Sequence, residues 1–267
     1  MYKHVQTVPS RMRGFLTAEI HGKWLYMPAG IATAILVLSA AVLWLIGLQN
    51  PTPRFILDPQ APGRIQAINW PWWREYADLM HGRKYMMLTF DDGPADQATN
   101  DAILNTLKKH HAHAAFFIVC RNAQNPAGVQ TLKTLIAEGD PIANHSFNHH
   151  KIPKLADAEL QHEVGDCQKF LEESTGQKIK WFRPPWGQPT PALETALKQY
   201  HMTDVLWETN SGDCWLHTPE EVNSATMLEA NNGAVVLMHS NHVEALALDR
   251  SFTMLEEQGY RFVLADQ

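Results

Sequence analysis

Apolar and polar positions along the chain follow two different periods from residue 85 onward. Between short apolar runs, apolar residues recur at helical spacing, as Ile103, Leu104 and Leu107 do. The runs are rich in β-branched or aromatic residues and predict seven strands, at residues 85–90, 114–120, 141–144, 179–183, 203–207, 234–239 and 260–264. Alternating strands and helices indicate a parallel sheet with right-handed crossovers. The pattern predicts an α/β fold, and seven such units favour a closed or nearly closed β/α barrel over an open doubly wound sheet.

A third pattern, one long apolar run, occupies the N-terminal region. Residues 29–48 carry no charge, and a helix of that length, rising about 1.5 Å per residue, spans the ~30 Å hydrocarbon core of a bilayer. Basic residues before the run outnumber acidic ones: Lys3, Arg11, Arg13 and Lys23 against Glu19. By the positive-inside rule, residues 1–28 form a cytoplasmic segment and the rest of the chain is exported.

We therefore expect residues 29–48 to be an uncleaved transmembrane signal anchor in the inner (cytoplasmic) membrane. The protein would be single-pass, with its folded domain on the periplasmic or extracytoplasmic side. A cleaved signal peptide and a buried core helix are the alternatives.

The rest of the chain divides into a connecting part and one domain. Residues 49–84 begin with a proline-rich stretch and are interpreted as a linker and leading segment, which precedes a domain at 85–267. The formal net charge of -6 disfavours nucleic-acid binding. Cys120, Cys167 and Cys214 lack the spacing of a zinc or redox motif and predict no disulfide framework, although one pair could oxidise outside the cytoplasm.

Polar side chains gather where the predicted strands end. These residues are Asp91, Asp92, His145, Arg183, Asp213 and His239. Active sites of β/α barrels lie at this C-terminal end of the strands. Two adjacent buried carboxylates repel each other unless cations neutralise them, and a divalent metal beside an arginine would do so. The pattern therefore predicts a metal-dependent site at this end.

His145 and His149 are the candidate histidine ligands. They are four residues apart, so if the segment forms one helical turn their side chains lie on one face and can chelate a single ion. His150 would then face away. Two imidazoles and one carboxylate leave positions open for water and substrate, as in catalytic zinc sites. The alternative is that these histidines are solvent-exposed or satisfied in the core.

Arg183 and His239 are the candidate residues for charge and proton handling. The guanidinium of Arg183 can pair with one aspartate and hold it ionised as a base, unless Arg183 is an ordinary surface arginine before a proline turn. Histidine titrates near physiological pH, so His239 can act as a general acid. The alternative for His239 is a core histidine at the end of a strand.

Five motifs in order resemble the polysaccharide deacetylase family, also called the NodB-homology domain or carbohydrate esterase family 4. They are TFDDGP, HSFNH, RPPWG, SGDCW and LMH, and the resemblance spans residue 85 to about 265. It implies a distorted (β/α)7 barrel in a catalytic domain at 85–267. It also implies the metal-dependent removal of N-acetyl, and sometimes O-acetyl, groups from sugars.

The resemblance implies a role for each matching residue. Asp91 resembles the catalytic base held by Arg183, and His239 resembles the acid tuned by Asp213. The implied metal ligands are Asp92, His145 and His149, and the implied substrate-binding residues are Trp186 (through its backbone N–H), Trp215 and Leu237. In one departure from the family pattern, Cys214 separates Asp213 from Trp215, which are usually adjacent. In two others, His150 stands where a proline is common and Trp186 replaces a tyrosine.

Residues and resemblance together predict a hydrolase that removes N-acetyl groups from glycans containing N-acetylglucosamine. Candidate substrates are peptidoglycan, chito-oligosaccharides and exported polysaccharides. The expected cofactor is a divalent metal, Zn²⁺ first and Co²⁺ or another ion as alternatives, and the expected partners are the glycan and, through 29–48, the membrane. Alternatives are an O-acetyl (xylan-type) esterase, an amidase on a small non-sugar amide, or a catalytically weak, membrane-tethered glycan-binding protein. The oligomeric state is not predicted.

Overall fold

The computed structural model describes residues 38, 54–68 and 82–266 of the chain. The chain divides into the units Met1–Thr52 and Pro53–Gln267, and all described residues except Leu38 lie in the second. The predicted transmembrane segment 29–48 lies outside the described residues apart from Leu38. Among the residues that are described, no helix has both the length and the apolarity needed to cross a membrane.

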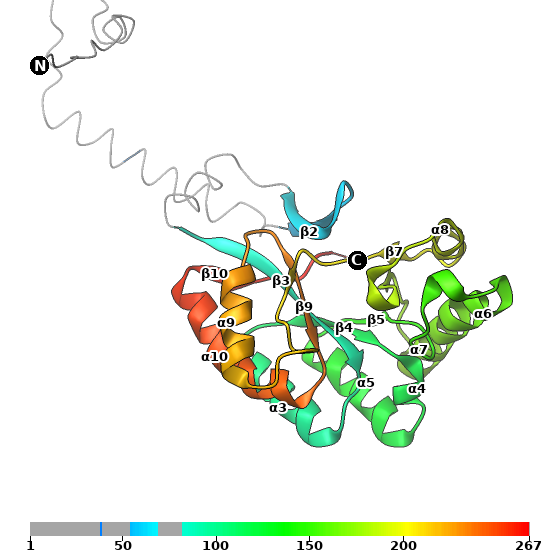
Figure 1. Cartoon of the computed structure of the whole chain (residues 1–267), viewed down its shortest axis with the longest axis horizontal. Coiled ribbons are helices and arrows are strands. Elements are labelled where there is room, and N and C mark those ends of the chain that lie inside the picture. Colours follow the sequence, from blue (N-terminus) through cyan, green and yellow to red (C-terminus); the bar gives the residue numbers. More distant parts are fainter. Residues whose placement is uncertain (1–37, 39–53, 69–81, 267) are drawn as a thin grey trace, which may run out of the picture. The chain divides into compact units, whose positions relative to one another are not determined.

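A parallel sheet forms the centre of the unit Pro53–Gln267. Its strands are β3 (Lys84–Gly93), β4 (Ala114–Ile118), β5 (Ile142–Asn144), β6 (Trp181–Phe182), β7 (Thr203–Asp204), β8 (Thr209–Asn210), β9 (Val235–His239) and β10 (Tyr260–Phe262). They are ordered β7-β6-β5-β4-β3-β9-β8, and β10 pairs with the start of β3 (Figure 1). All seven predicted runs contain a strand, and every pairing in this sheet is parallel. The sequence pattern misses β8, because two residues show no alternation.

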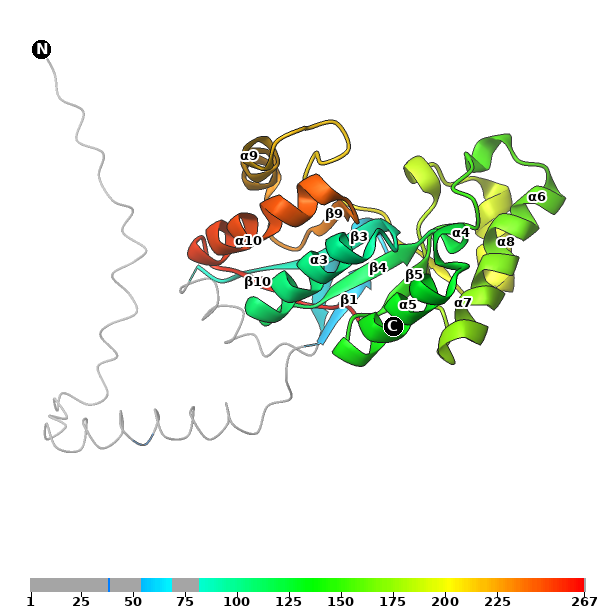
Figure 2. The same ribbon diagram turned by 90° about the horizontal axis from the view of Figure 1, so that it is seen from below.

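Helices cover the outer face of the sheet (Figures 1 and 2). The α-helices are α3 (Gln97–Lys109), α4 (Cys120–Ala123), α5 (Pro126–Glu138), α6 (Asp157–Gln161), α7 (Cys167–Thr175), α8 (Pro191–Gln199), α9 (Pro219–Glu229) and α10 (His242–Glu257). Single turns of other helix types are η2 (Ile152–Lys154), η3 (His162–Asp166) and η4 (Pro185–Gly187). Five helices begin at a residue whose side chain accepts the N–H three positions on: Asp96, Asn125, Thr190, Thr218 and Asn241. Such caps satisfy donors that a helix start leaves free.

The sheet curls into an incompletely closed barrel. Strands β7 and β8 are the two ends of the strand order, yet only residues 205–208 separate them along the chain. Alternation divides the side chains between two faces, since Met86 and Leu88 on β3 pack in the helix-facing core whereas Met87 packs inside the curl. The result agrees with the predicted barrel, with the gap between β7 and β8 as its distortion.

A β-hairpin occupies part of the stretch predicted as a linker. It consists of β1 (Arg54–Asp58) and β2 (Ala61–Ile68), and its Phe55 and Ile65 pack inside the curl with Met87 and Val235. Met87 and Val235 belong to the N-terminal halves of their strands, so the hairpin fills the end of the barrel opposite to the strand C-termini. The prolines suggested a linker, but Pro59 lies in the turn and Pro62 on an edge strand, where a missing N–H is tolerated.

A disulfide joins Cys120, the first residue of α4, to Cys167, the first residue of α7. The backbone N–H of Cys120 also donates to the carbonyl of Ser146, at 3.1 Å. The sequence left open that one cysteine pair could oxidise, and Cys120 and Cys167 form such a pair. It ties two helices together beside the HSFNH segment.

Gly63 allows the hairpin to approach the connection between β7 and β8. A Cβ atom at Gly63 would lie 2.5 Å from the backbone carbonyl carbon of Trp207, closer than atoms can pack. We expect Gly63→Ala to lower the free energy of unfolding by about 1–3 kcal/mol, measured by urea denaturation. Gln66→Ala, an exposed change on the same strand, is the control and should stay within about 0.5 kcal/mol of the parent. Equal stability of the two variants would contradict this packing.

Candidate active site

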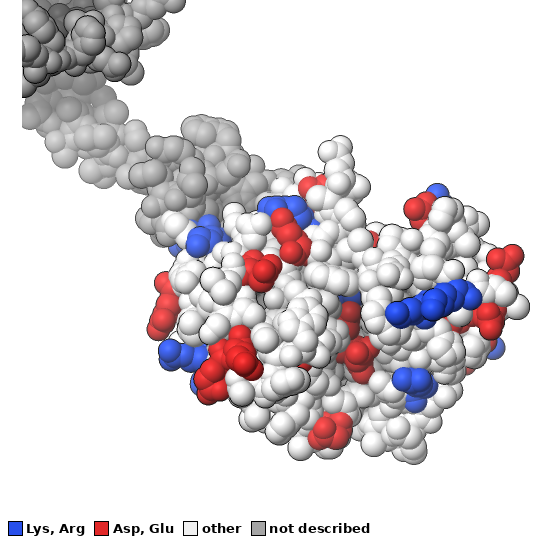
Figure 3. All heavy atoms as spheres, in the orientation of Figure 1, with Lys and Arg blue, Asp and Glu red and all other residues white. Residues whose placement is uncertain are grey.

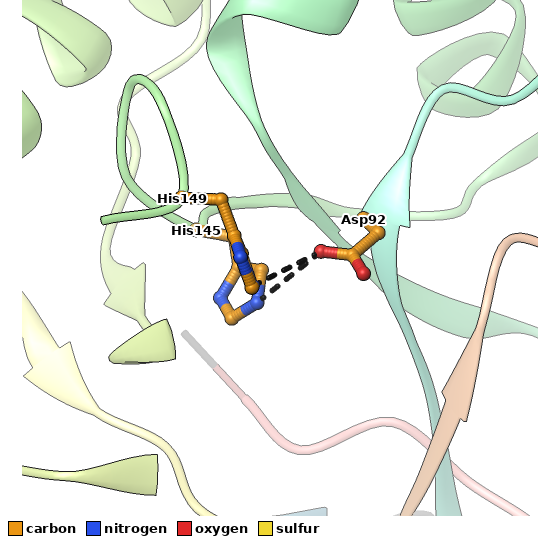
Figure 4. Close-up of side chains that lie close together, drawn as sticks. All are labelled: Asp92, His145 and His149. Carbon is orange, nitrogen blue, oxygen red and sulfur yellow. Dashed lines mark ion pairs between the residues drawn. The ribbon is translucent and has the colours of Figure 1, made fainter. Parts of the chain in front are cut away.

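Asp92, His145 and His149 converge at the C-terminal end of the sheet (Figure 4). Asp92 Oδ1 lies 3.3 Å from Nε2 of His149 and 3.7 Å from Nε2 of His145. Atoms bound about 2.0–2.2 Å from a tetrahedral zinc ion lie roughly 3.4 Å apart. Asp92 Oδ1 is also buried and has no hydrogen-bond partner among the described residues. Both the spacing and the unsatisfied oxygen fit a divalent metal at this point.

The histidine segment converges as a loop and not as the helical turn considered above. Residues 145–150 are irregular, and Ser146 and His149 have φ angles of 72° and 63°. Side chains replace the helical hydrogen bonds, because Asn144 Oδ1 accepts the N–H of Ser146 (2.8 Å) and Ser146 Oγ accepts the N–H of His149 (3.0 Å). Such φ values in non-glycine residues cost about 1–3 kcal/mol each and are typical of functional sites.

Glu163, in η3, supports this loop and is not singled out by the sequence. Its buried carboxylate accepts the backbone N–H of Asn148 (2.8 Å) and lies 2.9 Å from Nδ1 of His150. His150 therefore points to Glu163 and is not among the converging metal-ligand atoms. Burial opposes the charge of Glu163, but hydrogen bonds from Asn148 outweigh burial and lower the pKa of the carboxyl group. The sequence carries no signal for this role, since Glu163 is one acidic residue among several in a helical segment.

Asp91 pairs with Arg183 below the metal-ligand residues. Arg183 Nη1 lies 2.7 Å from Asp91 Oδ1 and donates a second hydrogen bond to Thr89 Oγ1, at 2.8 Å. The other carboxylate oxygen, Asp91 Oδ2, lies 3.5 Å from Nε2 of His145. The side chain of Arg183 is 0% exposed, and its Cζ lies 4.1 Å from the centre of the Phe117 ring. The pair thus sits on top of the apolar interior of the barrel.

Arg183 also satisfies backbone groups on both sides of it. Its Nε and Nη2 donate to the carbonyls of Val205 (2.8 Å) and Leu206 (3.1 Å), which lie in the gap between β7 and β8. Its own carbonyl lies 2.7 Å from Nδ1 of His145. A proton on Nδ1 makes this hydrogen bond and leaves the lone pair of His145 on Nε2, the atom that faces Asp92.

His239, at the end of β9, is held by Asp213. Its Nδ1 lies 2.8 Å from Asp213 Oδ1, and its backbone N–H donates to Oδ2, at 2.7 Å. Burial disfavours the charged imidazole, but hydrogen bonds to Asp213 and Cys214 and the charges of Asp213 and Asp91 outweigh burial. Together they raise the pKa of His239 to about 11. Protonated His239 is therefore the favoured form at neutral pH.

Cys214, the residue inserted before Trp215, is exposed and points to His239. Its Sγ lies 3.1 Å from Nδ1 and 3.3 Å from Nε2 of the imidazole. The insertion leaves the contact between Asp213 and His239 intact.

The three predicted substrate-binding residues differ in exposure. Trp186 is 49% exposed, and its ring centre lies 4.4 Å from that of His149. Trp215 is 61% exposed. Leu237 is buried and lies two residues before His239 on β9, so both side chains face the same side of the sheet. Trp186 thus borders the metal-ligand residues, and Leu237 lies beneath the acid candidate.

Two residues at the start of α10 lie near His239 and were not predicted, namely the N-cap Asn241 and Glu244 in the first turn. Asn241 Nδ2 donates to Asp213 Oδ2 at 2.9 Å, while its Oδ1 accepts the N–H of Glu244 and so caps the helix. An asparagine directly before an apolar helical stretch is a cap signal that could have been found. Glu244 is fully buried, and burial together with the charge of Asp213 raises its pKa to about 8. No sequence pattern distinguishes Glu244 from an ordinary acid in the first turn of a helix.

Comparison with known proteins matches residues 79–205 to the family model of polysaccharide deacetylases. The peptidoglycan-N-acetylmuramic acid deacetylase PdaC of Bacillus subtilis is 31% identical over 186 residues, which cover 69% of this chain and 38% of that protein. A peptidoglycan-N-acetylglucosamine deacetylase of Bacillus cereus is 30% identical over 199 residues, which cover 71% of this chain and 90% of that protein. The match to PdaC therefore spans well under half of that relative's length.

Solved structures with the same fold include both active and inactive relatives. The structure of PdaC has a TM-score of 0.62 and 32% identity, covering 68% of this chain and 87% of that one. A CE4 family pseudoenzyme from Bacillus anthracis has a TM-score of 0.63 and 27% identity, covering 67% and 63%. Because the fold occurs in a pseudoenzyme, activity has to be argued from the site residues of this chain.

Asp213 is expected to control the titration of His239. A raised folded-state pKa means that the interaction stabilises the protein fully below the ordinary histidine pKa of about 6.5, and that this stability is lost as pH rises through about 11. Asp213→Asn should lower the pKa of His239 toward its ordinary value, measured by NMR titration of the imidazole. Asp166→Asn, which alters the exposed pair with His162, is the matched control and should leave His239 unchanged. An unaltered His239 titration in Asp213→Asn would refute the assignment.

Proposed function

We propose a function for this chain, which belongs to the polysaccharide deacetylase family. The chain is a metal-dependent hydrolase that removes N-acetyl groups from glycans containing N-acetylglucosamine. One observation carries the proposal, which is that the two adjacent aspartates both approach His145 but differ in their second partner, His149 for Asp92 and Arg183 for Asp91. Asp92 Oδ1 faces Nε2 of His145 and His149, whereas Asp91 Oδ1 pairs with Arg183. This arrangement suits one carboxylate that binds a metal beside one that accepts a proton.

The metal would be held by Asp92, His145 and His149. A divalent ion in such a site polarises a carbonyl oxygen and lowers the pKa of a water from 15.7 toward roughly 7. Zn²⁺ suits the two imidazoles and one carboxylate, and Co²⁺ or another divalent ion is the alternative. The ion and its identity are part of the proposal.

Asp91 acts as the base in this mechanism. Arg183 occupies Oδ1 and orients the carboxylate, while Oδ2 remains available to take the proton of the attacking water. The acetamide carbonyl becomes tetrahedral, and the backbone N–H of Trp186 donates to its oxygen, an interaction typically worth about 100- to 1000-fold in rate.

His239 acts as the acid. Asp213 holds Nδ1, so Nε2 is left to deliver a proton to the departing sugar amine. Because its pKa is raised, His239 is protonated at neutral pH before substrate binds. The products are acetate and a free amino sugar. Leu237 and Trp215 are proposed as the walls of the pocket for the acetyl methyl group.

A peptidoglycan substrate is supported by the two named relatives, although one is named for N-acetylmuramic acid and the other for N-acetylglucosamine. Exposed Trp186 and Trp215 offer apolar ring faces that suit sugar rings. On the face of the described residues in Figure 3, acidic and basic side chains are interspersed, so this face presents no large basic patch of the kind that binds a polyanion. The second candidate, an O-acetyl esterase, would use the same site residues on a different bond.

Residues 29–48 are proposed to anchor the domain to the inner membrane with the active site on its outer side. The disulfide between Cys120 and Cys167 supports an oxidising compartment, since such bonds are rare in the cytosol. Envelope glycans would be within reach of an enzyme placed there.

Substitution of the proposed base, Asp91, and of one proposed metal ligand, His145, should separate metal binding from catalysis. Asp91→Asn is expected to retain the metal, measured by elemental analysis, and to lose about 100- to 10,000-fold in turnover. His145→Ala should lose both, and His113→Ala, an exposed change before β4 at the opposite end of the sheet, should lose neither. Full turnover in Asp91→Asn would refute the base, and full metal content in His145→Ala would refute the ligand set.

Acetate release by the purified full-length chain tests the activity itself. We expect release from peptidoglycan or N-acetylglucosamine oligomers, its loss with a chelator, and its recovery when Zn²⁺ or Co²⁺ is added back. Release from acetylated xylan alone would favour the O-acetyl esterase. Release that survives complete removal of the metal would contradict the mechanism.

A further inference from the structure

Cys214 brings a sulfur ligand to His239, which ends β9 beside β3. Its Sγ lies 3.3 Å from Nε2 of His239, and the side chain is exposed to solvent. Cys214 is also the free cysteine of the chain, because Cys120 and Cys167 form the disulfide. Asp213, Cys214 and His239 together place carboxylate, sulfur and imidazole atoms within 4.8 Å of one another.

The separation of sulfur and nitrogen suits one ion. Bond lengths of about 2.3 Å to a thiolate and 2.0–2.1 Å to an imidazole, at a tetrahedral angle, place the two ligand atoms roughly 3.5 Å apart. The observed separation from Nε2 is 3.3 Å, but Sγ also lies 3.1 Å from Nδ1, so the sulfur faces the ring. The exposed side chain would have to rotate away from Nδ1 for one ion to bind both Sγ and the lone pair of Nε2.

Asp213 already orients the imidazole for this purpose. Both of its oxygens have partners, with Oδ1 at Nδ1 of His239 and Oδ2 accepting the N–H of His239 and Nδ2 of Asn241. A carboxylate on Nδ1 leaves Nε2 as the ligand atom, the arrangement common among metal-binding histidines. Asp213 therefore positions His239, and water or substrate would complete the coordination.

We propose that Cys214 and His239, positioned by Asp213, form a second and inhibitory site for a thiophilic divalent ion such as Zn²⁺ or Cd²⁺. Thiolate ligands select for such ions, whereas the set Asp92, His145 and His149 contains no sulfur. Binding replaces the thiol proton of Cys214 and the Nε2 proton of His239, so two protons leave for each ion bound.

Inhibition follows from the ligand atom to which the ion would bind. Nε2 of His239 is the atom that delivers a proton in the proposed function, and an ion bound there removes that proton. The inhibition rests on the proposed function, whereas the binding does not. Activity should therefore rise with the first equivalent of Zn²⁺ and fall as the second site fills.

Cadmium titration of the full-length chain tests the binding. A Cd²⁺–thiolate bond absorbs in the ultraviolet, and in the disulfide-bonded chain the signal can arise only at Cys214. We expect one equivalent of this absorption in the parent and none in Cys214→Ser. His145→Ala should keep the signal, because it changes only the other site.

His239→Gln tests the nitrogen ligand through the same signal. Loss of an outer partner of a metal ligand typically weakens binding about 10- to 100-fold, and loss of a direct ligand should cost at least as much. We therefore expect Cd²⁺ to bind His239→Gln at least tenfold more weakly than the parent. Equal affinity in the two proteins would remove His239 from the site, and absence of the signal in the parent would refute the site altogether.

Excess Zn²⁺ tests the inhibition. Measured against its own rate at one equivalent of Zn²⁺, Cys214→Ser should resist inhibition at Zn²⁺ concentrations that halve the rate of the parent. Equal inhibition of both proteins would overturn the proposal even if both deacetylate. A thiolate signal in a protein that releases no acetate would instead refute the proposed function and leave the second site standing.

Discussion

The rest of the structure depends on the hydrogen bonds and the ion pair made by the buried guanidinium of Arg183. It pairs with Asp91, satisfies the carbonyls of Val205 and Leu206 in the open part of the barrel, and offers its own carbonyl to His145. Removing a charge from water is costly, and an interior site retains it only when a counter-charge and hydrogen bonds compensate. Loss of any partner would leave a polar group unsatisfied. The positions of Asp91, of His145 and of the backbone between β7 and β8 are therefore coupled through Arg183.

The two ends of the barrel differ in composition and in role. The β1–β2 hairpin fills one end with Phe55 and Ile65, which join the apolar interior below Arg183. The other end collects charged and polar side chains from several strands, and it contains non-glycine residues in the left-handed region, among them Asp92, His149 and Trp186. Packing at the closed end and the disulfide beside the histidine loop provide the rigidity that holds such conformations.

The surroundings of His239 explain why a proton stays on it. Asp213 binds Nδ1 and is itself held by Asn241, the N-cap of α10. Glu244, in the first turn of α10, is fully buried and its pKa is raised. It therefore adds less negative charge near Asp213 than an ionised carboxylate would. Cys214 adds a sulfur near both nitrogens of the imidazole. Acid strength and metal affinity at this position are thus set by the same contacts.

Sequence periodicity determined the seven main strands, their parallel pairing and the end of the barrel at which Asp91, Asp92, His145, Arg183 and His239 gather. These features follow from local alternation and from the rule that strands of one direction end together. The hairpin was missed because proline is read as a break unless its edge position is known, and β8 because two residues have no period. Glu163 and Glu244 could not be found either, since their roles come from burial and not from residue type.

Only the tertiary structure decided which aspartate faces which partner, and that the histidines converge through a loop held by Asn144 and Glu163. It also decided that Cys214 turns toward His239. Side-chain direction at these places depends on hydrogen bonds between segments far apart in the chain, such as the bond between Asp91 and Arg183, which are 92 positions apart. A single sequence records which residues are present at the strand ends, whereas the folded packing sets where their atoms point.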